Sequence, residues 1–85
     1  MKATVKFYVF DLPPGFADAE IGIKTDTVIK DIIDACIGLI KQRGVTIDEN
    51  ELRTATVLTN GKWSDLDTSV SDGDIISIIR PMDGG

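Results

Sequence analysis

The sequence contains no histidine and only one cysteine, Cys36. A single thiol cannot form a disulfide within the chain, and without histidine it cannot build a zinc site of the Cys/His type. Chains without disulfides are typical of a reducing compartment, so we expect a cytoplasmic protein. The sequence also lacks a glycine-rich phosphate-binding loop, which leaves few catalytic groups and argues against an enzyme. We therefore expect no metal and no cofactor.

Long apolar runs and clusters of basic residues are missing as well. No stretch approaches the roughly 20 apolar residues of a membrane-spanning helix, and the first residues lack the apolar run of a signal peptide. Acidic residues outnumber basic ones by 14 to 9, which gives a formal net charge of −5. Nucleic acids are bound largely through lysine and arginine, so we expect no nucleic-acid partner. We also expect no membrane partner. The acidic chain should instead bind a protein with a basic docking surface.

Apolar residues are numerous enough for one small domain. They make up 42% of the 85 residues, against 27% charged residues, which is a globular rather than a disordered balance. A chain of this length buries only about 60% of the surface that it exposes when unfolded, so we expect a thin core between two layers. We assign this domain to residues 1–80 and a flexible tail to residues 81–85.

Two strands are predicted near the start of the chain. Apolar and polar residues alternate over residues 4–10, which places Tyr8 and Phe10 on the strand face opposite Val5. A loop with two prolines and a glycine follows, and a second strand is expected over residues 19–24. Strands so close in sequence should pair as an antiparallel hairpin.

A helix is predicted next, because apolar residues recur at helical spacing over residues 28–40. Thr27 is the expected N-cap, and Gly44 is the expected residue at the C-terminal end. Cys36 lies on the apolar stripe, so we interpret it as a buried and inert thiol rather than a reactive one.

The second half of the chain reads as loops, turns and strands. In order, it predicts a solvated loop at 48–51, a strand at 54–59, a turn at Asn60-Gly61, a possible short strand near Trp63, a turn at Asp72-Gly73 and a strand at 75–79. We explain the two aspartates around Gly73 by turn chemistry rather than by metal binding.

These elements predict an α+β protein of the ubiquitin-like β-grasp type. One main helix covers a mixed sheet of four to five strands, and the first and last strands lie side by side as a parallel pair. The expected core residues are those on the inward faces: Val5, Phe7, Ile21, Ile23, Ile33, Ile37, Ile40, Val57, Ile76 and Ile78.

An apolar patch is expected on the other face of the sheet. If Ile76 points inward, Ile75 and Ile79 point outward, where Tyr8 and Phe10 of the neighbouring strand should join them. Such a patch often marks a protein interface, and we predict that these four residues bind a partner.

Several short motifs resemble one family. Asn60-Gly61-Lys62, Asp65-Leu66-Asp67-Thr68, Asp72-Gly73-Asp74, the isoleucine strand, Pro81 and the terminal Gly84-Gly85 are similar to the small subunit of molybdopterin synthase, the thiamine-pathway sulfur carrier and archaeal small modifier proteins. The resemblance covers the whole chain and is densest from residue 57 onward. It implies a β-grasp sulfur carrier that is a protein co-substrate rather than an enzyme.

The resemblance also implies where the chemistry takes place. An ATP-dependent adenylyltransferase of the ubiquitin-activating type would adenylate the Gly85 carboxylate, and a sulfurtransferase would convert it to a thiocarboxylate. Pro81, Met82, Asp83 and Gly84 would form the tail that carries this group. The sulfur would then be used inside the large catalytic subunit of molybdopterin synthase, in molybdenum or tungsten cofactor synthesis.

Other functions share the same features. A ubiquitin-like modifier would be joined to target lysines through the same carboxyl group, and the sulfur acceptor could belong to thiamine or transfer-RNA synthesis. A passive ubiquitin-like interaction domain would not need the glycine pair. Asp83 stands where molybdopterin carriers usually have a small uncharged residue, and Arg80 stands where proline is common, so both are departures from the molybdopterin pattern.

Overall fold

The computed structural model describes residues 1–8, 18–46 and 48–79. Predictions for Phe10, for the loop after it and for residues 80–85 lie outside these residues. The described elements are β1 (Lys2–Tyr8), β2 (Asp18–Gly22), α1 (Ile29–Gln42), α2 (Glu49–Arg53), β3 (Thr56–Thr59), β4 (Lys62–Trp63) and β5 (Ile75–Ile79).

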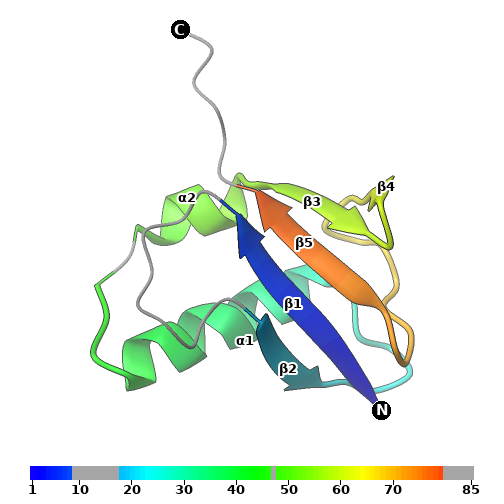
Figure 1. Cartoon of the computed structure of the whole chain (residues 1–85), viewed down its shortest axis with the longest axis horizontal. Coiled ribbons are helices and arrows are strands. Elements are labelled where there is room, and N and C mark those ends of the chain that lie inside the picture. The colour runs from blue at the N-terminus through cyan, green and yellow to red at the C-terminus, as the bar shows by residue number, and fades with distance from the viewer. Residues whose placement is uncertain (9–17, 47, 80–85) are drawn as a thin grey trace, which may run out of the picture.

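The strands form one mixed sheet in the order β2-β1-β5-β3-β4. Strands β1 and β5 are parallel and lie in its centre, with Thr4 opposite Ile75 and Tyr8 opposite Ile79. The other neighbouring pairs are antiparallel. Figure 1 shows the two central strands running side by side, with β2 next to β1 on one side and the β3–β4 hairpin next to β5 on the other. The predicted parallel pair and mixed sheet are thus confirmed.

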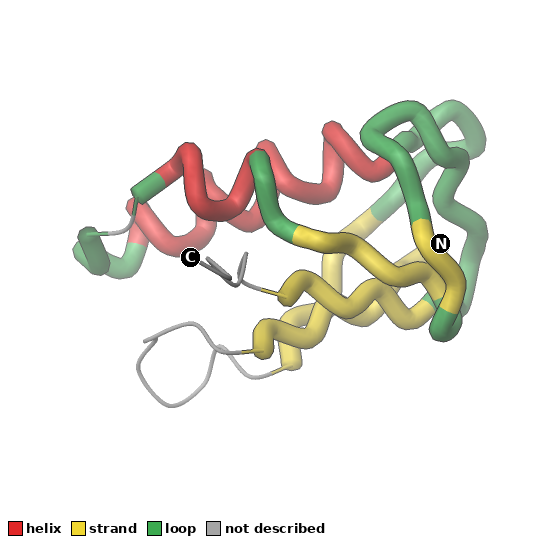
Figure 2. Tube along the Cα trace, turned by 90° about the horizontal axis from the view of Figure 1, so that it is seen from above, coloured by secondary structure: helices red, strands yellow, loops and turns green. Residues whose placement is uncertain are grey.

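The helices cover one face of the sheet, so that the described chain has two layers (Figure 2). The apolar stripe of α1 is buried against this inner face, with each of its six residues no more than 4% exposed: Ile29, Ile32, Ile33, Cys36, Ile37 and Ile40. Nine of the ten predicted core residues are buried, and Phe7 is half-buried against the core. Ala3, Leu52 and Val70 belong to the core and were not predicted.

Helix α1 begins one residue later than expected, because Thr27 is not its N-cap. The N-cap is Val28. The Thr27 hydroxyl accepts a hydrogen bond from the Lys24 N–H at 2.8 Å, and the Asp31 carboxylate accepts one from the Val28 N–H at 3.0 Å. A carboxylate in the first turn also suits the positive end of the helix dipole. The C-terminal prediction is confirmed, since Gly44 follows the helix with a φ of 74°.

The predicted solvated loop at 48–51 is wrong, because a short helix, α2, begins at Glu49. Asp48 caps it by accepting a hydrogen bond from the Asn50 N–H at 2.9 Å. Leu52 faces the core with none of its surface exposed. Burial of this one leucine anchors a segment whose other residues are mostly polar. No helix among the described residues is long and apolar enough to cross a membrane.

The two predicted turns are confirmed and are linked to each other. Asn60 and Gly61 have φ values of 52° and 83°, the left-handed pair that a two-residue hairpin turn requires, and β4 follows as the expected short strand. The Asn60 amide donates to the Asp74 carboxylate and accepts from the Ile75 N–H, each at 2.9 Å. Asp72 accepts from the Lys2 N–H at 2.9 Å.

These contacts explain the aspartates as turn residues. Within the described ranges no group of three or more acidic or cysteine side chains is placed to hold a metal ion.

Candidate functional site

The candidate site starts at the end of the two central strands. Ile79 ends β5, and its cross-strand partners are Tyr8 on β1 and Thr56 on β3. Because direct cross-strand partners share a face, these three side chains form a row on the face opposite α1. The residues that follow Ile79 in sequence therefore begin at the middle of one end of the sheet, beside an exposed tyrosine.

The structure confirms which strand face is exposed. Tyr8 is 45% exposed and Ile75 is 44% exposed, whereas Ile76 and Ile78 are wholly buried. Ile79 is half-buried. Tyr8, Ile75 and Ile79 therefore face outward, as predicted. Phe10 lies outside the described residues.

Two of the predicted interface residues are neighbours, and one lies apart from them. Tyr8 and Ile79 are directly opposite each other, but Ile75 is at the other end of β5, opposite Thr4. At about 3.3 Å per residue, four residues separate Ile75 from Ile79 by about 13 Å. Ser77 lies between them, so the apolar surface along β5 is interrupted by a hydroxyl group.

The sequence reasoning missed two apolar residues of this face. Leu58 on β3 lies opposite Ser77, and Trp63 on β4 lies opposite Leu58. Trp63 is 78% exposed, more than any other large apolar side chain in the described residues. Together Tyr8, Leu58, Trp63, Ile75, Ser77 and Ile79 form what we call the outer sheet face. The Asn60-Gly61 turn was the only signal for Trp63, and a two-residue strand is too short for alternation to assign its face.

The thiol of Cys36 is far less available than this face. It is 1% exposed on the core side of α1, and burial raises its pKa to about 12. A thiol with that pKa is almost wholly protonated at neutral pH, and the thiolate is the form that acts as a nucleophile. The interpretation of Cys36 as a buried core residue is confirmed.

The outer sheet face carries two exposed aromatic side chains, Tyr8 and Trp63. An exposed tryptophan and tyrosine are the side-chain types that most often dominate protein interfaces. The predicted tail residues Pro81, Met82, Asp83, Gly84 and Gly85 lie outside the described chain, and the structure fixes only their point of attachment at the end of the sheet.

Comparison with known proteins adds three kinds of finding. The model of the ThiS family matches residues 14–85. SAMP1 from Haloferax volcanii has a similar structure, with a TM-score of 0.72 and 26% identity over 100% of both chains. No curated protein sequence matches the chain.

Two structures at lower identity share the fold. A protein of Pyrococcus furiosus assigned as molybdopterin converting factor subunit 1 has a TM-score of 0.73 and 20% identity, over 96% of this chain and 99% of its own. A chain from the complex of subunits 1 and 2 of the molybdopterin-converting factor of Helicobacter pylori has a TM-score of 0.59 and 22% identity over 100% of both chains. These likenesses confirm the predicted ubiquitin-like β-grasp fold.

Proposed function

The chain belongs to the ThiS family, and from this premise we propose that it is a sulfur carrier protein whose C-terminal carboxylate, on Gly85, is converted to a thiocarboxylate. The observation that carries the proposal is the match of the family model through Gly84 and Gly85, on a domain of the ubiquitin-like β-grasp fold. The protein would be a co-substrate that other enzymes modify, not a catalyst.

The chemistry proceeds in two displacements at the end of the chain. A carboxylate oxygen of Gly85 attacks the α-phosphorus of ATP, and pyrophosphate leaves with the electrons of the broken P–O bond. Hydrosulfide then attacks the carbonyl carbon and expels AMP. With hydrosulfide, the products are the thiocarboxylate, AMP and one proton. Without the first step, the negative charge of the carboxylate would repel the sulfur nucleophile.

Glycine suits this position because the reacting carbon belongs to the main chain. Side chains next to it would obstruct a narrow active site, and glycine has none and adopts backbone angles that other residues avoid. Residues 81–85 can extend at most about 17 Å, which is enough to enter a cleft in another protein. Pro81 lacks an N–H group and so discourages further strand pairing beyond β5.

The partner that adenylates Gly85 would dock on the outer sheet face. Tyr8 and Ile79 lie at the end of the sheet where the residues of the tail begin, and Trp63 extends the same face across β4. A docking surface continuous with the start of the tail would place the tail in the partner's active site. The net charge of −5 favours a partner with a basic surface. We propose an ATP-dependent adenylyltransferase of the ubiquitin-activating type and a sulfurtransferase as these partners.

For the sulfur acceptor we propose the molybdopterin of a molybdenum or tungsten cofactor, reached through a larger synthase subunit. The motifs from Asn60 to Asp74 and the names of two structural relatives support this choice. Asp83 would then need a basic or solvated position in the synthase channel, because its carboxylate lies one residue before the glycine pair. Thiamine and transfer-RNA synthesis are the alternative acceptors.

A second function, conjugation to other proteins, is favoured by one observation. SAMP1, at 26% identity, is described in a second structure as a small archaeal modifier protein. An adenylated Gly85 could form an amide with a lysine amine as readily as a thiocarboxylate with sulfur. Isopeptide-linked Gly-Gly remnants on lysines of other proteins, found after proteolysis, would establish this second role.

Activation is tested by ATP–pyrophosphate exchange with the cognate adenylyltransferase. The intact protein should support exchange of labelled pyrophosphate into ATP, because adenylation is reversible. A Gly84→Trp variant should not, because its indole obstructs the approach to the carboxylate. If the intact protein supports no exchange with its adenylyltransferase, the carrier function fails and the passive interaction domain becomes the better interpretation.

A further inference from the structure

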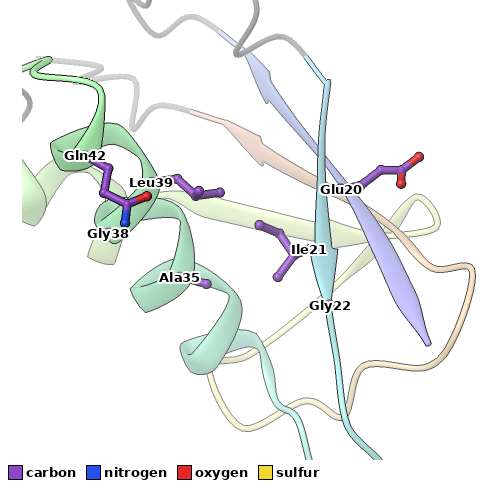
Figure 3. Close-up of a pocket in the computed structure, with 7 residues that line it drawn as sticks. All are labelled: Glu20, Ile21, Gly22, Ala35, Gly38, Leu39 and Gln42. Atoms are coloured by element: carbon purple, nitrogen blue, oxygen red, sulfur yellow. The ribbon is translucent and has the colours of Figure 1, made fainter.

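Within residues 1–8, 18–46 and 48–79, one edge of the sheet has no strand paired to it, and this edge lies beside a groove. Strand β2 is the outermost strand on its side, and among the described residues no strand pairs with its outer edge. Between β2 and α1 there is an open cavity of about 480 Å³, lined by Glu20, Ile21, Gly22, Ala35, Gly38, Leu39 and Gln42. Figure 3 shows the Ile21 side chain pointing across the groove toward the helix, while Glu20 points the other way.

The backbone of β2 presents to this groove hydrogen-bonding groups that are not used in pairing with β1. In an antiparallel pair, opposite residues alternate between those that exchange hydrogen bonds and those that do not. The Ile23 N–H donates to the Met1 carbonyl at 3.0 Å, and Thr4, opposite Glu20, donates instead to Asp74 on the β5 side at 2.9 Å. The N–H and C=O groups of Glu20 and Gly22 therefore point away from β1, toward the open edge.

The helix side of the groove is apolar except for Gln42 and has unoccupied space. Ala35, Gly38 and Leu39 lie along it, and Leu39 is 37% exposed. A Cβ atom added to Gly38 would meet no atom within 4 Å. The absence of a side chain at this position leaves space above the helix at the level of Ile21. An aliphatic side chain placed there would be in contact with Ile21 and Leu39.

We propose that this groove binds an extended segment of another protein, which adds a strand to the outer edge of β2 and inserts aliphatic side chains over Gly38. Strand addition to an exposed edge takes its affinity from main-chain hydrogen bonds and its specificity from pockets for alternate side chains. Both parts are present here, because the outward groups of Glu20 and Gly22 adjoin the apolar cavity. The site is separate from the outer sheet face and does not depend on the proposed sulfur chemistry.

The charges of β2 define the segment further. Side chains alternate along an added strand, so that those not facing the groove lie beside Asp18 and Glu20 on the opposite face. Both carboxylates are exposed. Glu20 lies 3.5 Å from the Lys2 ammonium and Asp18 is opposite Lys6 on β1, so a cation on the added strand would approach the carboxylates from their open side, where opposite charges on neighbouring strands stabilise the pairing. We therefore assign the ligand as a segment in which lysine or arginine alternates with branched aliphatic residues.

A second copy of this chain fits the groove poorly. Two β2 strands paired antiparallel about Glu20 would set like charges opposite each other, which destabilises a sheet. The side chain that faces the groove from such a strand would be Ile21, which is 7% exposed in the core of its own domain. It is therefore not available to fill the cavity of another copy.

The first test removes a backbone donor from the edge. Glu20→Pro loses an N–H that makes no bond to β1, so the sheet should persist, as proline is tolerated on edge strands. Glu20→Thr is the matched control, since it loses the same carboxylate but keeps the N–H. The probe is a capped peptide of sequence KIKVKI, titrated into labelled protein while amide shifts are recorded by NMR. We expect shifts in β2 and over residues 35–42, and affinity about tenfold weaker for the proline variant than for the threonine variant.

The second test fills the cavity. Gly38→Leu places a side chain in open space on α1, so the fold should be retained and peptide shifts should disappear. Lys30→Leu adds leucine to an exposed position outside the groove and should leave binding intact. The proposal is overturned if the peptide changes the amide chemical shifts of Ser77 and Trp63 instead of those in β2. It is overturned as well if the proline and threonine variants bind the peptide equally, or if millimolar peptide changes no chemical shift. It is also overturned if β2 shifts depend on protein concentration without peptide, which would identify a second copy as the occupant.

Discussion

The two faces of the central strand β5 carry the same amino acid with opposite consequences. Ile76 and Ile78 have no exposed surface and pack beneath α1, whereas Ile75 is 44% exposed and Ile79 is half-buried on the outer sheet face. Hydrophobicity alone therefore does not tell which isoleucine stabilises the domain. Successive side chains of a strand point to opposite faces of the sheet, so the position along β5 decides the role of each isoleucine. The inner residues pack the sheet against the helix, and the outer ones remain available to a partner.

The largest expected effect breaks the inner face. Ile76→Ala should lower the free energy of unfolding by about 2 to 5 kcal/mol, because it leaves a cavity in a closely packed core. Ile75→Ala, on the neighbouring residue, should lower it by less than about 1 kcal/mol. Urea denaturation of the two variants measures the difference directly. Equal losses would mean that the two faces do not differ in the way the burial values indicate.

The next effect concerns the outer face and should leave the fold intact. Trp63→Ala should weaken binding to the adenylyltransferase by about 2 kcal/mol, roughly thirtyfold, if this tryptophan is an anchor of the interface. Ile79→Asp should weaken it as well, because the apolar contact is lost and the new carboxylate gives up its hydration on docking. Titration calorimetry with each variant gives the affinities, and circular dichroism checks the fold.

The matched control for these variants is Leu66→Asp. Leu66 is 45% exposed, but its carbonyl accepts a hydrogen bond from the Lys30 N–H at the start of α1, away from the outer sheet face. Its replacement should leave the affinity unchanged. A loss of affinity as large as that of Ile79→Asp would mean that the partner does not dock on the outer sheet face.

The smallest effect, about 1 kcal/mol between pH 9 and pH 10, is a pH dependence of the inner face. Because burial raises the pKa of Cys36 from 9.0 to about 12, its contribution to stability is complete below pH 9 and is lost progressively as the pH rises toward 12. Between those values the unfolded chain releases the proton and the folded chain retains it. The wild-type protein should therefore lose up to about 1.4 kcal/mol per pH unit more than Cys36→Ala. Urea denaturation at pH 9 and pH 10 gives the free energy of unfolding of both proteins. An equal change for the wild-type protein and Cys36→Ala would contradict this prediction.

The regular parts of the fold could be predicted from sequence because their periods are strong. Alternation in β1 and the helical spacing of α1 each assign many residues at once, and the isoleucine run of β5 has a high β propensity. The ends of elements depend instead on single hydrogen bonds: Thr27 binds Lys24 rather than capping α1, and one buried leucine, Leu52, turns a polar segment into α2.

The candidate site was predicted in part for the same reason. Tyr8 and Ile79 follow from alternation, and their juxtaposition follows from the parallel pairing of the first and last strands. Trp63 could not be placed, because its strand has two residues and its face is set by pairing with Leu58. The groove beside β2 could not be predicted either, since it depends on how an edge strand and the helix that follows it are spaced in the folded domain.

The central claim is that the domain presents a reactive carboxylate on Gly85 and takes no further part in the reaction. The most direct test is intact mass spectrometry after incubation with the cognate adenylyltransferase, ATP and hydrosulfide, with the Gly85 deletion in parallel. The full-length protein should exchange one oxygen for sulfur in its C-terminal fragment. The deletion should not, because its carboxylate lies back by up to about 3.6 Å and misplacement by about 1 Å can already cost a hundredfold in rate. No sulfur on the full-length protein, or equal sulfur on both, would contradict the account.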